Sequence, residues 1–153
     1  MKSDVLDDSR DKLSTDAIAG GKVKVFAKGS TVLVWRSGIL QHSFPMARVC
    51  SDFTVNQDMK VFQPTSSEFL AEYVRIFLTI FKEKLRRECV KEGTTVQSVN
   101  TTVFMKQVIP KLALSRQKEI IKLEEKCYEA IQKSFSRLDS SKALKKSLIN
   151  QVF

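Results

Sequence analysis

The chain of 153 residues is poor in glycine and proline, with only five of one and three of the other. Both residues interrupt helices, so their scarcity favours a largely helical chain. The length suffices for one domain with a hydrophobic core, or for a small domain plus an extension. The apolar stretch from Val74 to Phe81 is too short for a membrane span, and it contains Arg75.

Chemically reactive side chains are also scarce. His42 is the only histidine, and the three cysteines, Cys50, Cys89 and Cys127, lie far apart with no Cys-x-x-Cys pair. The sequence has no glycine-rich phosphate loop, no nucleophile elbow and no metal-ligand spacing. We therefore expect no catalytic residue, no metal and no cofactor, and the protein is not expected to be an enzyme. Three separated thiols favour a reducing compartment, either cytoplasm or nucleus.

What the chain has in excess is positive charge. Its formal net charge is +9, although the first twenty residues are net acidic. Such an excess suits a negatively charged partner, which could be nucleic acid or an acidic protein surface. The alternative is a scatter of lysines that serve only solubility.

Residues 65–93 show the clearest helical pattern. Apolar residues recur there at steps of three and four, as expected for one broad helix face. Thr65 and Glu68 fit a capping box, Pro64 stops extension backwards, and Gly93 is placed to end the helix. The pattern predicts a single central helix of about 27 residues, or roughly 40 Å.

The remaining segments complete the predicted organisation. Residues 1–21 are expected to be a disordered acidic tail. Residues 22–44 alternate with a period of two between glycine-containing turns, which predicts a three-stranded antiparallel meander. Residues 46–53 fit either a short helix or a fourth strand. Later helices are expected over 101–109, ended by Pro110, over 116–138, and over 142–151 after a break at Asp139-Ser140-Ser141. The predicted fold class is therefore α+β and mostly α, with a small N-terminal meander, a long central helix and three to four further helices.

Residues 46–114 resemble the histone-fold subunit centromere protein X. The segments that carry the resemblance are MARVCSDF, NQDMKVFQPTSSEFLAEYVRIF and TTVQSVNTTVFMKQVIPKLAL. The resemblance implies a histone-fold-like helical core over 45–114, followed here by a C-terminal helical extension over 115–153. It also implies that the long helix crosses the same helix of a partner. The predicted interface comprises Tyr73, Phe77, Ile80 and Phe81, unless the chain's own later elements cover them.

Two further sets of residues are candidates for binding. Ile131 belongs to the apolar face of the 116–138 helix, which could form a short coiled coil with a protein partner or with a second copy. The candidates for DNA phosphate contacts are Lys82, Lys84, Arg86, Arg87, Lys91, Lys142, Lys145 and Lys146, although a solvated helix face would have the same composition.

The predicted function is thus a non-enzymatic interaction subunit of a multiprotein complex, DNA-associated through a basic helix face. The alternative is a scaffold or dimerisation module that binds no nucleic acid. A third class is a fragment of an enzyme whose active site lies elsewhere in a longer parent.

Overall fold

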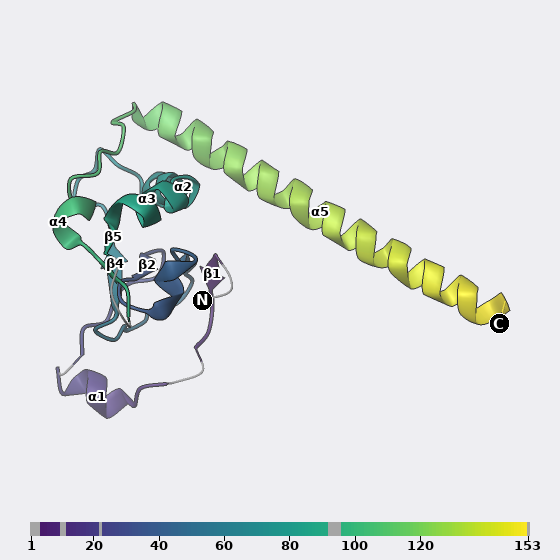
Figure 1. Ribbon diagram of the computed structural model, residues 1–153, viewed down its shortest axis with the longest axis horizontal. Coiled ribbons are helices and arrows are strands. Elements are labelled where there is room, and N and C mark those ends of the chain that lie inside the picture. The colour runs from purple at the N-terminus through teal and green to yellow at the C-terminus, as the bar shows by residue number, and fades with distance from the viewer. Residues whose placement is uncertain (1–3, 10–11, 22, 92–95, 153) are drawn as a thin grey trace.

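A computed structural model describes residues 4–9, 12–21, 23–91 and 96–152. It shows a small mixed domain from which one long helix projects (Figure 1). The α+β class and the predominance of helix agree with the prediction. The elements, however, differ in several places from those expected.

A four-stranded sheet forms the centre of the domain. Its strands are β1 (Val5–Leu6), β2 (Thr31–Val34), β3 (Met46–Val49) and β4 (Met59–Phe62), in the order β1-β3-β2-β4. β1 pairs in parallel with β3, and the other pairings are antiparallel. Strands β5 (Val90–Lys91) and β6 (Ser98–Val99) form a separate antiparallel ribbon.

The predicted meander over 22–44 is wrong in detail, because β2 is the one named strand that the structure describes there. The first apolar run contributes only an isolated bridge between Phe26 and Phe53. The third forms the 3₁₀ helix η1 (Gly38–Gln41), whose N-terminus is capped by the hydroxyl of Ser37. The partners of β2 come instead from later in the chain. Residues 46–53, for which a helix and a strand were both open, contain strand β3.

Both faces of the sheet are buried. On one face, Leu33, Phe44 and Met46 belong to a cluster that also includes residues of the helices. On the other face, Val32, Ala47 and Val49 are covered by side chains of the N-terminal arm and of the 53–61 segment. The alternation along β2 and β3 therefore separates two apolar clusters instead of one apolar and one solvated face.

The predicted single central helix is wrong. The stretch contains α2 (Ala71–Ile80) and α3 (Lys82–Cys89), which are separated at Phe81 by a backbone conformation of φ −93° and ψ 9°. Residues 65–70 precede α2 as turns, and Leu70 is its N-cap without a side-chain cap, so the capping box does not form. The two helices pack against different neighbours, α2 against the last helix and α3 against α4 (Thr101–Phe104). Tertiary packing thus overrides the local helical pattern. Gly93 lies outside the described residues.

Two smaller differences concern the ends of the domain. The segment 1–21, predicted to be disordered, contains β1 and the short helix α1 (Thr15–Ala19), with Ser14 as its N-cap. The side chain of Asn100 caps α4, and α4 ends at Phe104, well before Pro110.

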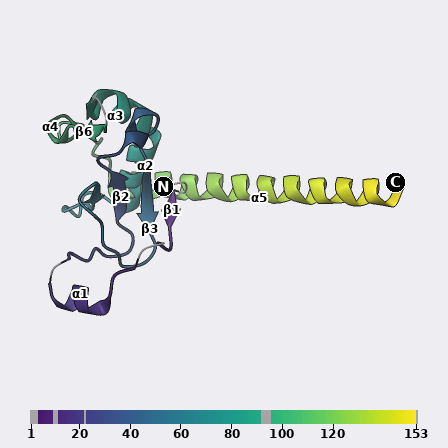
Figure 2. The same ribbon diagram turned by 60° about the horizontal axis from the view of Figure 1, so that its bottom comes forward.

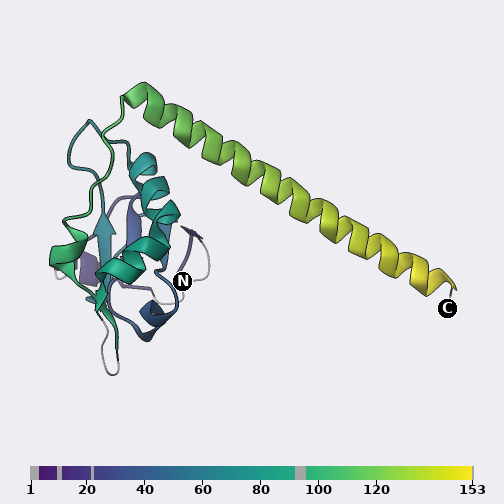
Figure 3. The same cartoon turned by 45° about the horizontal axis from the view of Figure 1, so that its top comes forward.

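The last element is α5 (Leu114–Val152), a single helix of 39 residues. It replaces the two helices predicted over 116–138 and 142–151. The Asp139-Ser140-Ser141 sequence does not interrupt it, because the hydroxyl of Ser140 donates to the carbonyl of Ser136 within the helix. At 1.5 Å per residue the helix is about 58 Å long, and most of this length extends beyond the domain (Figures 1 and 3).

Candidate functional site

Gln117, in the first turn of α5, is the residue that joins the long helix to the domain. Its side chain is completely buried. The amide oxygen accepts a hydrogen bond from the backbone N–H of Leu70 at 2.9 Å. The amide nitrogen donates to the carbonyls of Glu68 at 2.7 Å and Leu112 at 2.8 Å. One side chain therefore satisfies three backbone groups at the point where α2, the preceding loop and α5 meet.

Two further contacts fix the same junction. The hydroxyl of Tyr73, on α2, donates to the carbonyl of Pro110 at 2.9 Å. Arg75 and Glu124 form an ion pair between α2 and α5 at 2.9 Å, and the arginine side chain is mostly buried. Glu124 lies two turns of α5 after Gln117, so these contacts hold the direction of α5 as well as its position.

Beyond Glu124, the described side chains of α5 through Asn150 are all exposed. They nevertheless include an apolar stripe. Tyr128, Ile131, Phe135 and Leu138 follow one another at steps of three, four and three, and each is about half exposed. This spacing matches the a and d positions of a heptad repeat. A stripe of this kind on a helix that leaves its domain is typical of surfaces that bind another protein.

The predicted interface on the central stretch is only partly at the surface. Tyr73 is buried in the junction described above and is not accessible to a partner. Ile80 and Phe81 are exposed, and the ring of Phe81 lies 4.6 Å from that of Phe77 between centroids. Contact of Phe77, Ile80, Phe81 or Ile131 with a partner remains a prediction.

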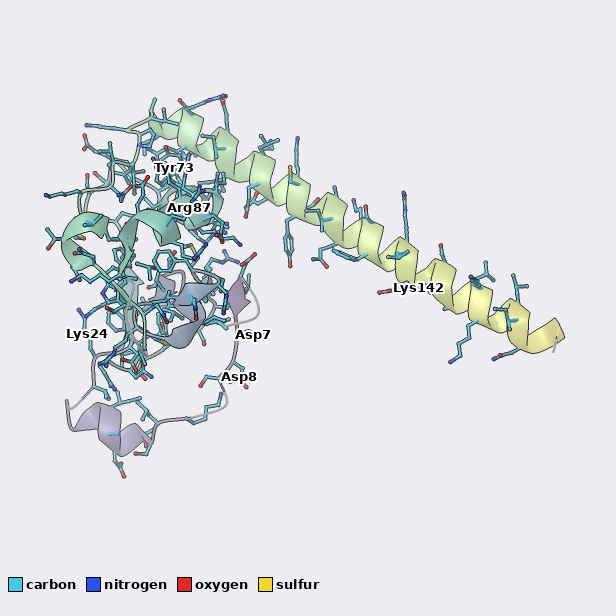
Figure 4. All side chains as sticks on the ribbon, viewed as in Figure 1. Asp7, Asp8, Lys24, Tyr73, Arg87 and Lys142 are labelled. Atoms are coloured by element: carbon cyan, nitrogen blue, oxygen red, sulfur yellow. The ribbon has the colours of Figure 1, made fainter. Side chains whose placement is uncertain are left out.

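The eight cations predicted to contact DNA do not form one surface. The four on α3, and Lys91 on β5, lie on the domain, whereas Lys142, Lys145 and Lys146 lie far along α5. Figure 4 shows Arg87 on the domain and Lys142 on the projecting part of α5. Within α3, Arg86 pairs with Glu83 and also donates to the carbonyl of Gln41. Lys84 has Glu88 at 3.9 Å. Lys82, Arg87 and Lys91 are exposed and form no ion pair with a described carboxylate. Their role in DNA contact remains a prediction.

The structure also brings together three polar residues that sequence analysis did not group. Ser98 on β6 pairs with Lys91 on β5, and on its other side it bridges to Arg36, just after β2. We call Arg36, Ser98 and Lys91 the ribbon row. The sequence shows Arg36 only as part of a turn, because a pairing across some sixty residues has no local signal.

An apolar cavity of about 580 Å³ lies between the N-terminal arm and the outer face of the sheet. Its walls include Val25, Val32 and Val49, and three carboxylates also line it, those of Asp7, Asp8 and Asp52. Figure 4 shows Asp7 and Asp8 on the arm. Lys12 also lines the cavity and pairs with Asp8, so the lining carries more negative than positive charge and is unsuited to a phosphate backbone.

Neither a metal site nor a membrane span is found in the described part of the chain. Over residues 4–9, 12–21, 23–91 and 96–152, no group of three or more histidine, cysteine, aspartate or glutamate side chains could hold a metal ion. In the same ranges, no helix has the length and apolar character needed to cross a membrane.

Comparison with known proteins gives one informative similarity. No protein-family model matches the chain. The chain is similar to the specificity subunit of the type I restriction enzyme EcoR124I/EcoR124II from Escherichia coli, with 26% identity over 126 residues. The match covers 82% of this chain and 31% of that subunit. The chain thus spans about a third of the length of the relative.

This similarity corrects the predicted function. Sequence analysis led to an interaction subunit with a histone-fold-like core, or to a scaffold that binds no nucleic acid. The relative is instead a specificity subunit of a restriction enzyme. It gives no support to a histone-fold complex or to a nuclear location.

Proposed function

We propose that this chain is a DNA-recognition part of a specificity subunit in a complex of the restriction-enzyme type. The observation that carries this proposal is the extent of the match. A match of 126 residues in a chain of 153 takes in strands β2 to β4, helices α2 to α4 and the start of α5, wherever it begins. It therefore supports relatedness of most of the domain and of its junction with the long helix, and not of an isolated motif.

The architecture suits such a role. A compact domain supplies a rigid platform, and a long helix at one end supplies an attachment to other protein parts. The net charge of +9 favours association with a phosphate backbone. Sequence specificity would come from side chains that reach base edges, for which the loops of the domain are the available positions.

The helix α5 requires a protein partner under this proposal. Exposure of its apolar stripe to water is unfavourable, and the heptad spacing suits packing against another helix. A second α5 from another copy of the chain is a suitable partner. In an antiparallel pair centred near Lys133, residues at the a positions of one helix meet residues at the d positions of the other. Tyr128 then faces Leu138 of the second copy, and Ile131 faces Phe135.

One charge that follows the stripe, that of Lys142, can be paired in this register. Lys142 lies fourteen residues after Tyr128, at the next-but-one a position, where an unpaired cation would destabilise the seam. In the antiparallel arrangement it lies opposite Glu124 of the second copy. The register therefore offers Lys142 a carboxylate, one that also pairs with Arg75 of its own chain. Lys142 is then a partner contact and not a DNA contact.

DNA recognition is tested by selection. The full chain is incubated with a library of duplexes carrying a random central segment, and the bound fraction is recovered, amplified and sequenced over several rounds. We expect enrichment of one sequence motif, because specific sites bind about 10³-fold or more tighter than random DNA.

The control is the same selection at high salt, which removes non-specific phosphate binding first. A motif that persists there supports base recognition. A chain that retains no duplex at low salt, or one whose recovered sequences remain random at every salt concentration, contradicts the proposed function.

A further inference from the structure

The ribbon row offers two cations and a hydroxyl on one solvent-facing surface. Residues that pair directly in an antiparallel ladder project from the same face of the sheet. Arg36 pairs with Ser98, and Ser98 pairs with Lys91, so all three side chains share a face. The alternate face carries Trp35, Val90 and Val99, which pack in the main apolar cluster. The row must therefore point outward, and Arg36 and Lys91 are indeed exposed.

The backbone fixes the spacing of these groups. The N–H of Val99 donates to the carbonyl of Trp35 at 2.9 Å, and the N–H of Ser37 donates to that of Gln97 at 3.0 Å. These two bonds flank the Arg36–Ser98 pair, which makes it the closer type of antiparallel pair, with Cα atoms about 4.5 Å apart. Arg36 and Lys91 thus lie roughly 10 Å apart, one strand on each side of Ser98. Both side chains are long enough to converge above the serine hydroxyl.

The two cations are not neutralised within the described part of the chain. Arg75, Arg86 and Arg116 each form an ion pair with a glutamate. Arg36 and Lys91 form none with any described carboxylate. The backbone N–H of Arg36 donates a hydrogen bond to the carbonyl of Asp58 at 3.1 Å, which holds the backbone of Arg36 in place.

The position of the row also leaves room for a large ligand. In Figure 2, β6 and α4 lie on the side of the domain away from the body of α5. A duplex could therefore approach the ribbon without meeting α5 or a protein bound to it. The apolar cavity with its three carboxylates lies between the N-terminal arm and the sheet, and none of the three row residues lines it.

From this geometry we propose that Arg36, Ser98 and Lys91 form a binding site for one phosphate group of a DNA backbone. The site rests on the proposed function and deepens it, because it states where the duplex is held. Arg36 and Lys91 supply charge-assisted hydrogen bonds, and the hydroxyl of Ser98 donates a neutral one between them. Such a site fixes the position and direction of the duplex on the domain and does not distinguish bases.

The test is fluorescence anisotropy of the full chain with a labelled random-sequence duplex of about 30 base pairs, titrated between about 50 and 200 mM salt. In the double variant Arg36→Ala with Lys91→Ala, we expect binding to weaken about tenfold or more at low salt. The slope of log K against log salt concentration should fall by about one to two units, because fewer counterions are released. Ser98→Ala should weaken binding several-fold without changing that slope.

A matched control removes the same charges elsewhere. Arg137→Ala with Lys126→Ala takes one arginine and one lysine from exposed positions on α5 and should leave the slope unchanged. Emission from Trp35, which is buried next to the row, verifies that each variant is folded. If the ribbon variant and the control behave alike while the parent chain binds duplex, the phosphate site is wrong and the proposed function stands. If the parent chain binds no duplex at all, both are wrong.

Discussion

Gln117 and Leu70 are joined by a hydrogen bond of 2.9 Å between the side-chain oxygen of one and the backbone N–H of the other. Leu70 is the N-cap of α2 and has no side chain that could satisfy the backbone groups around it. A polar residue 47 positions later does so instead, from the first turn of α5. The start of α2 and the start of α5 are thus formed together.

Gln117→Leu should destabilise the domain by about 2–4 kcal/mol, because it leaves three backbone groups of the part-buried junction without their partner. The measurement is urea unfolding followed by Trp35 emission. Gln132→Leu is the matched control, since Gln132 is exposed on α5 and its change should have little effect on the midpoint. Equal midpoints for the two variants would contradict the role of the Gln117 amide.

Phe104 should be the most costly aromatic residue to truncate. Its ring lies 5.1 Å from Trp35, 6.2 Å from Phe44 and 5.2 Å from Phe62 between centroids. Phe104→Ala should cost about 3–5 kcal/mol of unfolding free energy, as large-to-small core changes do. Met105→Ala, at the next and exposed position, should be close to neutral. A small loss at Phe104 would mean that α4 is not needed to close the core.

Ile131→Asp should abolish self-association through α5. The change places a carboxylate in the seam of each helix, so the dissociation constant should rise about hundredfold or more. Ala130→Asp introduces the same charge at the neighbouring outward position and serves as the control. Sedimentation equilibrium at several concentrations distinguishes the two. A parent chain that is monomeric at all of them would contradict the antiparallel pair.

The three cysteines should differ in reactivity. Burial raises the pKa of Cys89 above its ordinary value of 9.0, and the nearby charge of Glu88 raises it further. Cys50 and Cys127 are exposed. With iodoacetamide near pH 8, we expect these two to be alkylated first and Cys89 only after unfolding, as peptide mass spectrometry would show. Alkylation of Cys89 at the same rate as the others would contradict its burial.

The same pKa shift has a consequence for stability. A thiol with a higher pKa in the folded chain holds its proton where the unfolded chain has lost it. Its contribution to stability is therefore complete below pH 9 and falls as the pH rises above that value. The urea midpoint of unfolding should therefore be lower at a pH above 9 than at pH 8. Cys89→Ala should reduce that decrease, because it removes the group that titrates.

Local signals in the sequence predicted some elements and missed others for identifiable reasons. The α+β class and the helical character of residues 71–80 and 82–89 agree with the prediction. The break at Phe81 could not be predicted, because no glycine or proline lies near it. It follows from the different neighbours of α2 and α3. The Ser140 hydroxyl, taken as part of a helix end, is satisfied inside α5.

The candidate site was harder to predict because its parts are distant in the sequence. Arg36 meets Ser98 only through strand pairing, and Gln117 meets Leu70 only when α5 docks. Neither relationship has a periodicity that a single sequence reveals. The apolar positions around Ile131, by contrast, were visible as a helical stripe, because that pattern is local.

The attachment of α5 at its first turns makes the helix a lever. From Glu125 to its end it extends about 40 Å beyond its last contact with the domain. A tilt of about 10° at the Gln117 junction would move the far end by roughly 7 Å, or two base-pair steps along a duplex. If two copies pair through α5 as proposed, small substitutions around Gln117, Tyr73 and Arg75 would change the separation of the two domains without altering any proposed DNA contact.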